Sequence, residues 1–354
     1  MIPFFDNTRQ YKSLKKELEP KILKLLRSGK YVSGEKVEEF EKNLAEYCDT
    51  KYAVCVNSGT MAIQLALESL DLEGSDILVP SLTFYATIEA IKRAGATPVY
   101  IDIDEYYCID TNQIREYLQM QDLPLVRAIL PVHLYGQCAN MTEILKIAQE
   151  YDLHVIEDAC QSIGATHFKN KAGSMGNAGC FSFYPSKNLG AFGEGGAIVT
   201  NDECLYETCK ALRNHGQTFS GVHEYMGLNG RMSEIQALIL NHKLSYLDSY
   251  IEKRQSIAQI YNEKLKDFVE IPKTLEGNTH TYHLYVVRGD IKEKLEKEEI
   301  GYGVHYPLAC HEIEKRNDEL PHTNEIKDIV SLPMFPELIK KEIERVCEVI
   351  RDEM

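Results

Sequence analysis

Short apolar runs alternate with helix-patterned segments from about Lys51 to Thr200 of this 354-residue chain. The apolar runs include AVCV, DILVP, TPVYIDI and HVIEDA, and the segments between them include TMAIQLALESL, ATIEAIKRAG and MTEILKIAQEYD. This order is typical of parallel strands joined by crossover helices. The sequence therefore predicts an α/β fold with a large, mostly parallel sheet.

The later part of the chain reads differently and predicts a second, smaller domain. DECLYETCKALRN and SEIQALILNHKLSYL, at 202–214 and 233–247, are predicted helices, the first opening on an acidic cap. YHLYVVRG and GVHYPL read as strands, and the chain closes with an amphipathic helix. Because 354 residues exceed one small core, we expect a large domain at 1–245 and a smaller α+β domain at 246–354.

The composition of the chain disfavours some classes of binding partner, namely nucleic acids and membranes. The chain is 44% hydrophobic and 26% charged, which is typical of a globular protein, and its net charge of -15 disfavours a nucleic-acid partner. The start, MIPFFDNTRQYKS, lacks a signal-peptide pattern, and no apolar run is long enough to span a membrane. We therefore expect a cytoplasmic protein with no membrane partner. The histidines lack metal-ligand spacing, so no metal site is predicted.

One lysine stands in an unusual segment. In FSFYPSKNLGAFGEGGAIVT, at 181–200, two strand-like runs frame a glycine-rich loop whose charged residues are Lys187 and Glu194. A partly desolvated lysine loses proton affinity, and its neutral amine can attack a carbonyl to form a Schiff base. An ordinary surface-loop lysine is the alternative.

The run Asn57-Ser58-Gly59-Thr60 follows a predicted strand and opens a predicted helix. Backbone N–H groups at such a helix start favour an anion. A plain serine N-cap followed by a turn glycine explains the same residues about as well.

Further polar and aromatic residues follow other predicted strands. Asp158 and Gln161 lie at the carboxyl end of a buried strand, where ligands of open α/β sheets bind, although Asp158 could instead cap the next helix. Phe84 could offer a ring face to a flat heterocycle or could be a core residue, and Ser182 adds a hydroxyl. Together with Lys187, these groups meet the needs of pyridoxal 5′-phosphate: phosphate anchoring, a stacked ring, a charge partner for the ring nitrogen and a lysine.

Five segments in order along the chain resemble the sugar aminotransferases of the DegT/DnrJ/StrS family. They are NSGTMAIQLAL, PSLTFYATIEAI, IEDACQSIGA, FSFYPSKNLGAFGEGGAIVT and GLNGRMSEIQA. The resemblance implies the aspartate aminotransferase type fold (fold type I), pyridoxal 5′-phosphate as cofactor, and a homodimer with shared active sites.

The matching positions imply individual roles. Lys187 resembles the Schiff-base lysine, and Asp158 resembles the partner of the pyridinium nitrogen. Gln161 is expected near the ring hydroxyl, and Phe84 is expected to stack on the ring. The phosphate contacts implied are Gly59, Thr60, Ser182 and, from the neighbouring subunit, Asn229.

The resemblance also implies substrates, namely glutamate as amino donor and a nucleotide-linked keto sugar as acceptor. PVHLYGQ and YPSKNLG resemble family members that act at C3 of a 3-keto-6-deoxy sugar, expected to be dTDP-linked with UDP left open. Tyr184 and Tyr306 are candidate sugar contacts, or ordinary packed tyrosines. A C4-specific aminotransferase, a sugar dehydratase on the same fold and a non-catalytic regulatory relative remain as alternatives.

Overall fold

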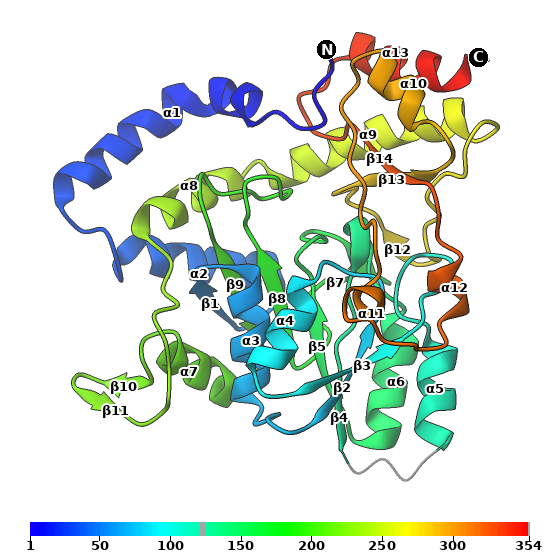
Figure 1. Cartoon of the computed structure of the whole chain (residues 1–354). Helices are drawn as coiled ribbons and strands as arrows, with labels where there is room; N and C mark the ends of the chain where they lie inside the picture. Colours follow the sequence, from blue (N-terminus) through cyan, green and yellow to red (C-terminus); the bar gives the residue numbers. More distant parts are fainter. Residues whose placement is uncertain (121–124, 353–354) are drawn as a thin grey trace.

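The computed structural model describes residues 1–120 and 125–352 and is built around a seven-stranded sheet (Figure 1). The strands of this sheet are β1 (Tyr52–Val56), β2 (Asp76–Pro80), β3 (Thr97–Ile101), β4 (Val126–Ile129), β5 (His154–Asp158), β8 (Ala178–Ser182) and β9 (Gly196–Thr200).

The sheet is mostly parallel, as predicted. Its spatial order is β1-β9-β8-β5-β4-β2-β3, and β9 runs antiparallel to both of its neighbours, β1 and β8. The other neighbouring pairs are parallel, so the carboxyl ends of β2, β3, β4, β5 and β8 lie along one edge. Ligands of open α/β sheets bind at such an edge.

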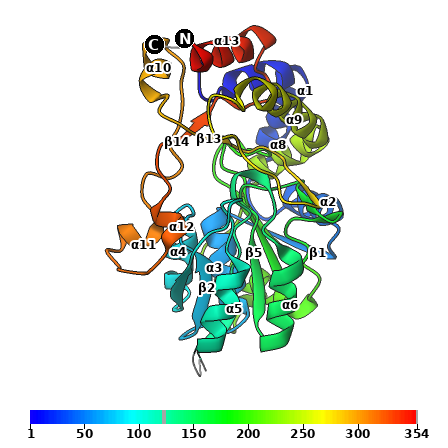
Figure 2. The ribbon, with the colours of Figure 1, turned by 90° about the vertical axis from the view of Figure 1, so that its right-hand side faces the viewer.

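Helices cover both faces of the sheet (Figure 2). On β1, Val54 and Val56 pack into one hydrophobic cluster and Ala53 and Cys55 into another, because successive strand residues point to opposite faces. The first cluster takes in α3 (Gly59–Ser69), α4 (Ala86–Arg93) and α7 (Glu203–Leu212). Apolar residues of the other face pack against α2 (Glu35–Tyr47), α5 (Thr111–Met120), α6 (Met141–Tyr151) and α8 (Glu234–Leu244).

The acidic cap predicted for the helix at 202–214 is present, since the carboxylate of Asp202 accepts from the amides of Cys204 and Leu205, 2.7 and 3.1 Å away. The helix predicted at 233–247 is instead two, because α8 ends at Leu244 and α9 (Leu247–Leu265) follows directly.

A further hydrophobic cluster forms beyond the sheet, around the antiparallel pair β13 (Tyr285–Arg288) and β14 (Ile329–Leu332). It includes residues of α9 and of the closing helix α13 (Lys340–Arg351). YHLYVVRG contains β13 as predicted, but GVHYPL forms no strand, and β14 supplies the partner of β13. The division between residues 245 and 246 stays a prediction.

Residues near the start of the chain contact the cluster around β13 and β14. Ile2 forms a parallel bridge with Ile300, and the guanidinium of Arg9 pairs with the carboxylate of Glu342 at 2.6 Å. The N- and C-termini accordingly lie at the same end of the molecule in both views (Figures 1 and 2).

The remaining elements are short apart from the long helix α1 (Asn7–Ser28). They are η1 (Leu134–Gly136), β6 (Thr166–His167), β7 (Asn170–Lys171), β10 (Gln217–Phe219), β11 (Val222–His223), β12 (Asn278–Thr279), α10 (Lys292–Lys297), α11 (Cys310–Ile313) and α12 (Pro321–Asn324). Within residues 1–120 and 125–352, none of the helices combines the length and apolar character needed to cross a bilayer.

Candidate active site

A cavity of about 440 Å³ opens where the carboxyl ends of the parallel strands meet. Nine of the ten predicted site residues line it: Gly59, Thr60, Phe84, Asp158, Gln161, Ser182, Tyr184, Lys187 and Tyr306. Its size falls in the ordinary range for small-molecule sites. The sequence therefore predicted which loops converge, because each of these residues lies at or just beyond a strand end or in a connecting loop.

Lys187 lies in the loop between β8 and β9, as its glycine-rich surroundings predicted. Its amide donates to the carbonyl of Tyr184 at 2.8 Å, and the next side chain, Asn188, donates to the carbonyl of Thr281 at 3.0 Å. The side chain is half-buried at the cavity, and desolvation of its amine lowers the pKa of Lys187. The nearby Cys160 and Asp158 act in the opposite direction. A lysine in this position loses its proton more readily than a surface lysine.

Asp158, the last residue of β5, is only 4% exposed. Its Oδ2 accepts a hydrogen bond from the hydroxyl of Thr87 at 2.8 Å, and its Oδ1 accepts from the amide of Cys160 at 3.1 Å. The hydroxyl of Thr87 also lies 3.0 Å from that of Thr83. The carboxylate is therefore held in place by groups on α4 and on its own loop, and it does not cap a helix.

The predicted anion site forms at the start of α3. The hydroxyl of Ser58 caps the helix by accepting from the amide of Met61 at 3.2 Å, whereas the amides of Gly59 and Thr60 belong to the first turn, which has no intrahelical acceptors. A Cβ on Gly59 would lie 2.7 Å from the Cβ of Ser182, so only glycine permits this close approach. The helix start and the hydroxyl at the end of β8 thus form one polar cradle.

Aromatic side chains form the outer wall. The rings of Phe84 and Tyr306 stack with centroids 5.9 Å apart, and Phe84 is 58% exposed. Gln161 accepts from the amide of Tyr135 at 2.9 Å and donates to the hydroxyl of Tyr306 at 2.9 Å. Gln161 therefore ties the sheet edge to the segment that carries Tyr306.

Several cavity residues were not predicted from the sequence. His283 and His305 line the cavity, and burial together with the charge of Lys187 lowers the pKa of both, that of His305 to about 4. Both imidazoles are therefore neutral near pH 7. Thr87 and Cys160 also line the cavity, and no sequence pattern indicated either residue.

Asn229 is the predicted residue that the structure does not bring into the cavity of its own chain. It lies in an exposed segment before α8, where its carbonyl accepts from the side-chain amide of Asn57 at 3.4 Å. The neighbouring Arg231 lines a separate hollow of about 850 Å³.

The groups that line the cavity match the ring nitrogen, the phosphate and the aldehyde of pyridoxal 5′-phosphate. A buried carboxylate faces the cavity at one end, a polar cradle that a Cβ at position 59 would fill lies at the start of α3, and a lysine with weakened proton affinity lies beside Asp158. These groups suit a ring nitrogen, a phosphate and an aldehyde, respectively.

Comparison with known proteins agrees with this match. The profile of the DegT/DnrJ/EryC1/StrS aminotransferase family matches residues 12–351. The pleiotropic regulatory protein of Geobacillus stearothermophilus is 37% identical over 368 residues, covering 99% of this chain and 98% of that protein. The dTDP-3-amino-3,6-dideoxy-alpha-D-galactopyranose transaminase of Aneurinibacillus thermoaerophilus is 39% identical over 364 residues, covering 99% of each chain. The structure of S. venezuelae DesV in complex with a ketimine intermediate superposes with a TM-score of 0.94 at 36% identity, covering 99% of this chain and 97% of DesV.

Proposed function

The chain belongs to the DegT/DnrJ/EryC1/StrS aminotransferase family, and we propose that it transfers the amino group of glutamate to C3 of a nucleotide-linked 3-keto-6-deoxy sugar. It is a pyridoxal 5′-phosphate-dependent aminotransferase with the fold of this family. The observation that carries the proposal is the convergence of Lys187 and Asp158 in one cavity beside the polar cradle of α3.

The bound cofactor supplies an aldehyde and an electron-withdrawing ring. We assign Lys187 to bind that aldehyde and, with its amine released, to move the proton at the donor's α-carbon. Asp158 would keep a proton on the ring nitrogen, because a buried carboxylate favours a nearby positive charge. The amides of Gly59 and Thr60 and the hydroxyl of Ser182 would hold the phosphate, Phe84 would offer its ring face to the cofactor ring, and Gln161 would contact the ring hydroxyl.

We assign the acceptor position to C3. The named substrate of the Aneurinibacillus relative carries its amino group at C3, and PVHLYGQ and YPSKNLG resemble C3 enzymes. Tyr184, 51% exposed at the cavity, and Tyr306 are the proposed sugar contacts. dTDP is the proposed nucleotide, with UDP as the alternative, and the product is an amino sugar for surface glycans or similar. The cytoplasmic location stays a prediction.

We also propose a homodimer whose sites are shared, with Asn229 reaching the phosphate bound by the partner. Three large apolar side chains close to Asn229 in the sequence are exposed: Phe219 at 62%, Tyr225 at 44% and Met226 at 96%. Such clustering is typical of a surface that meets another protein.

The charges in the cavity support active sites that are shared between two subunits. Among the cavity-lining residues in the described part of the chain, Lys187 is the one lysine, and there is no arginine. The carboxylates of glutamate and the diphosphate of a nucleotide sugar need further cations or hydrogen-bond donors. A second copy of the chain would supply them.

A regulatory role is the second candidate, because the Geobacillus relative is named a pleiotropic regulatory protein. A protein that does not turn over substrate has no need of a lysine and a buried carboxylate in one cavity, whereas here Lys187 and Asp158 both line it.

The decisive experiment is the reverse half-reaction. The purified enzyme, loaded with pyridoxal 5′-phosphate, is mixed with dTDP-linked 3-amino- and 4-amino-6-deoxy sugars, and the change in cofactor absorbance is followed. The proposal expects the 3-amino compound to react, and 2-oxoglutarate then to restore the spectrum with formation of glutamate. Reaction of the 4-amino compound alone would make the enzyme C4-specific, and reaction with neither compound nor with glutamate would favour the regulatory candidate.

A further inference from the structure

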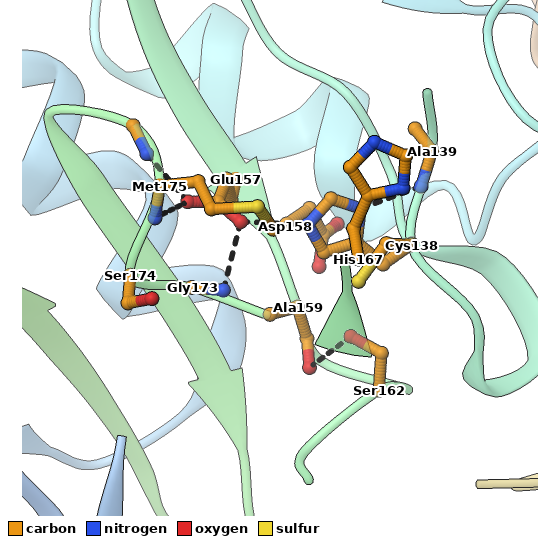
Figure 3. A network of polar contacts seen from close by, with 12 residues as sticks. Cys138, Ala139, Glu157, Asp158, Ala159, Ser162, His167, Gly173, Ser174 and Met175 are labelled. Atoms are coloured by element: carbon orange, nitrogen blue, oxygen red, sulfur yellow. Dashed lines mark hydrogen bonds and ion pairs between the residues drawn. The ribbon is translucent and has the colours of Figure 1, made fainter. Parts of the chain in front are cut away.

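A fully buried carboxylate lies directly beside Asp158 in the sequence but off the cavity. Glu157 and His133 are both 0% exposed, and neither lines the cavity. Figure 3 shows the carboxylate of Glu157 among the backbone amides of a tight turn. Its partners are the amides of Gly173, Met175 and Gly176, at 2.8, 2.7 and 2.6 Å, and Nε2 of His133 at 2.8 Å.

The hydrogen bonds define the state of both side chains. The amide of Ala139 lies 3.1 Å from Nδ1 of His133 and can only donate, so Nδ1 is an acceptor. In a neutral imidazole the proton is then on Nε2, which donates to Glu157. Four donors therefore surround the carboxylate of Glu157. An ionised carboxylate can accept hydrogen bonds from all four donors. A glutamine side chain at this position would place its NH2 group against some of these donors and leave them without an acceptor.

His133 also binds the backbone of Asp158. The amide of His133 donates to the carbonyl of Asp158 at 3.0 Å, and the amide of Asp158 donates to the carbonyl of Pro131 at 2.9 Å. Successive side chains of a strand point to opposite faces. Anchoring Glu157 on one face of β5 therefore fixes how the end of the strand is rotated, and this rotation directs the carboxylate of Asp158 toward the cavity.

We infer that Glu157 and His133 are positioning residues that hold Asp158 in the orientation needed to bind the ring nitrogen of the cofactor. The inference rests on the proposed function. An anchor for the turn at 173–176 would need the carboxylate alone. Here the imidazole of His133 also ties Glu157 to the segment whose main chain forms the parallel bridge with Asp158.

The chain provides a matched control. Glu234 is 2% exposed and accepts from three backbone amides, those of Gly34, Lys36 and Val37, at 2.9, 2.9 and 3.1 Å. It does not line the cavity. Glu157→Gln and Glu234→Gln are thus the same chemical change at two buried carboxylates that accept from backbone amides. Only Glu157 is adjacent to Asp158.

The test measures the dissociation constant of pyridoxal 5′-phosphate from the protein freed of cofactor, together with the melting temperature. Both variants should melt earlier than the wild type, because each leaves buried donors unsatisfied. Glu157→Gln should weaken cofactor binding about tenfold or more, and Glu234→Gln by less than about twofold. In an Asp158→Asn background, Glu157→Gln should cause little further loss, because its effect passes through Asp158.

An equal loss of affinity in both backgrounds, or wild-type affinity in Glu157→Gln, would overturn the inference and leave Glu157 a purely structural anchor. If Glu157→Gln does not fold, the same comparison is made with His133→Phe, and His133→Gln, which keeps a donor, should recover part of the affinity. Failure of the wild-type protein to bind the cofactor would instead refute the proposed function.

Discussion

The hydroxyl of Thr87 donates a 2.8 Å hydrogen bond to Oδ2 of Asp158, joining the first turns of α4 to the end of β5 across 71 residues of sequence. Thr87 is 1% exposed, so water does not compete for this bond. A hydrogen bond to a charged group contributes about 1.5–3 kcal/mol. We therefore expect Thr87 to orient the carboxylate of Asp158 toward the ring nitrogen of the cofactor.

We predict that Thr87→Val, which keeps the side-chain shape but removes the donor, lowers the affinity for pyridoxal 5′-phosphate about tenfold. Thr87→Ser keeps the donor and should stay close to the wild type. Equilibrium titration of the cofactor-free proteins measures both. Equal affinity of the valine and serine variants would show that the hydrogen bond has no part in cofactor binding.

Lys187→Ala should remain folded and lose transamination, because the variant lacks the amine that binds the cofactor and moves the proton. Removal of the amine also removes the cost of its partial desolvation, so the melting temperature of the cofactor-free protein should not fall. Lys187→Arg, which keeps a charge but supplies no comparable nucleophile, should be inactive as well. Turnover above background in either variant contradicts the assignment.

Lys243 should make stability depend on pH in the alkaline range. It is 1% exposed, its Nζ donates to the carbonyl of Gly190 at 2.7 Å, and burial lowers its pKa from 10.5 to about 8. Between pH 8 and 10.5 the unfolded state therefore binds the proton and the folded state does not. The contribution of Lys243 to the free energy of unfolding consequently rises with pH through this window, by about 3 kcal/mol in total.

Lys243→Met has no titrating group at this position. Urea unfolding of the wild type and the variant at pH 7 and pH 10 therefore measures the contribution of Lys243 to the pH dependence of stability. The variant's stability relative to the wild type should be highest at pH 7 and should fall toward pH 10. Other titrating groups are common to both proteins and cancel in the difference. A difference independent of pH would show that Lys243 keeps its ordinary pKa in the folded protein.

Inactive chains should complement each other if the sites are shared. Lys187→Ala is refolded together with Asn229→Asp, whose carboxylate would repel the phosphate of the partner's cofactor. Each mixed dimer then has one site with both wild-type groups, so a statistical mixture should regain about a quarter of wild-type activity. This requires that Asn229→Asp alone be badly impaired. Absence of recovery from isolated mixed dimers would rule out sharing through Asn229.

The fold and the site's location could be predicted from the sequence because both depend on local patterns. Alternating apolar runs and helices predict parallel strands, and parallel strands bring their carboxyl ends to one edge. Asp158 and Ser182 therefore line one cavity although 23 residues lie between them in the sequence. GVHYPL was wrongly predicted as a strand, because its pairing with β14 is limited to an isolated bridge between Gly303 and Ser331 and does not extend into a ladder.

Contacts between side chains on different elements were beyond sequence reasoning. Neither the threonine of α4 that fixes Asp158 nor the pairing of His133 with Glu157 follows from spacing, because each depends on how two elements pack. His133 in particular was given no role from the sequence, since it lacked metal-ligand spacing. Its role depends on two neighbours that only the folded sheet brings within reach.

The pairing of Ile2 with Ile300, and of Arg9 with Glu342, has a consequence for how the chain is made. A ribosome releases the first residues long before positions 300 and 342 exist, while the seven-stranded sheet can already assemble from the middle of the chain. The segment with Ile2 and Arg9 can therefore meet these partners only after residues 300 and 342 have been synthesised. A fusion or truncation at the N-terminus would act on this late closing step, and thus on the yield of folded protein, more than on the chemistry of the cavity.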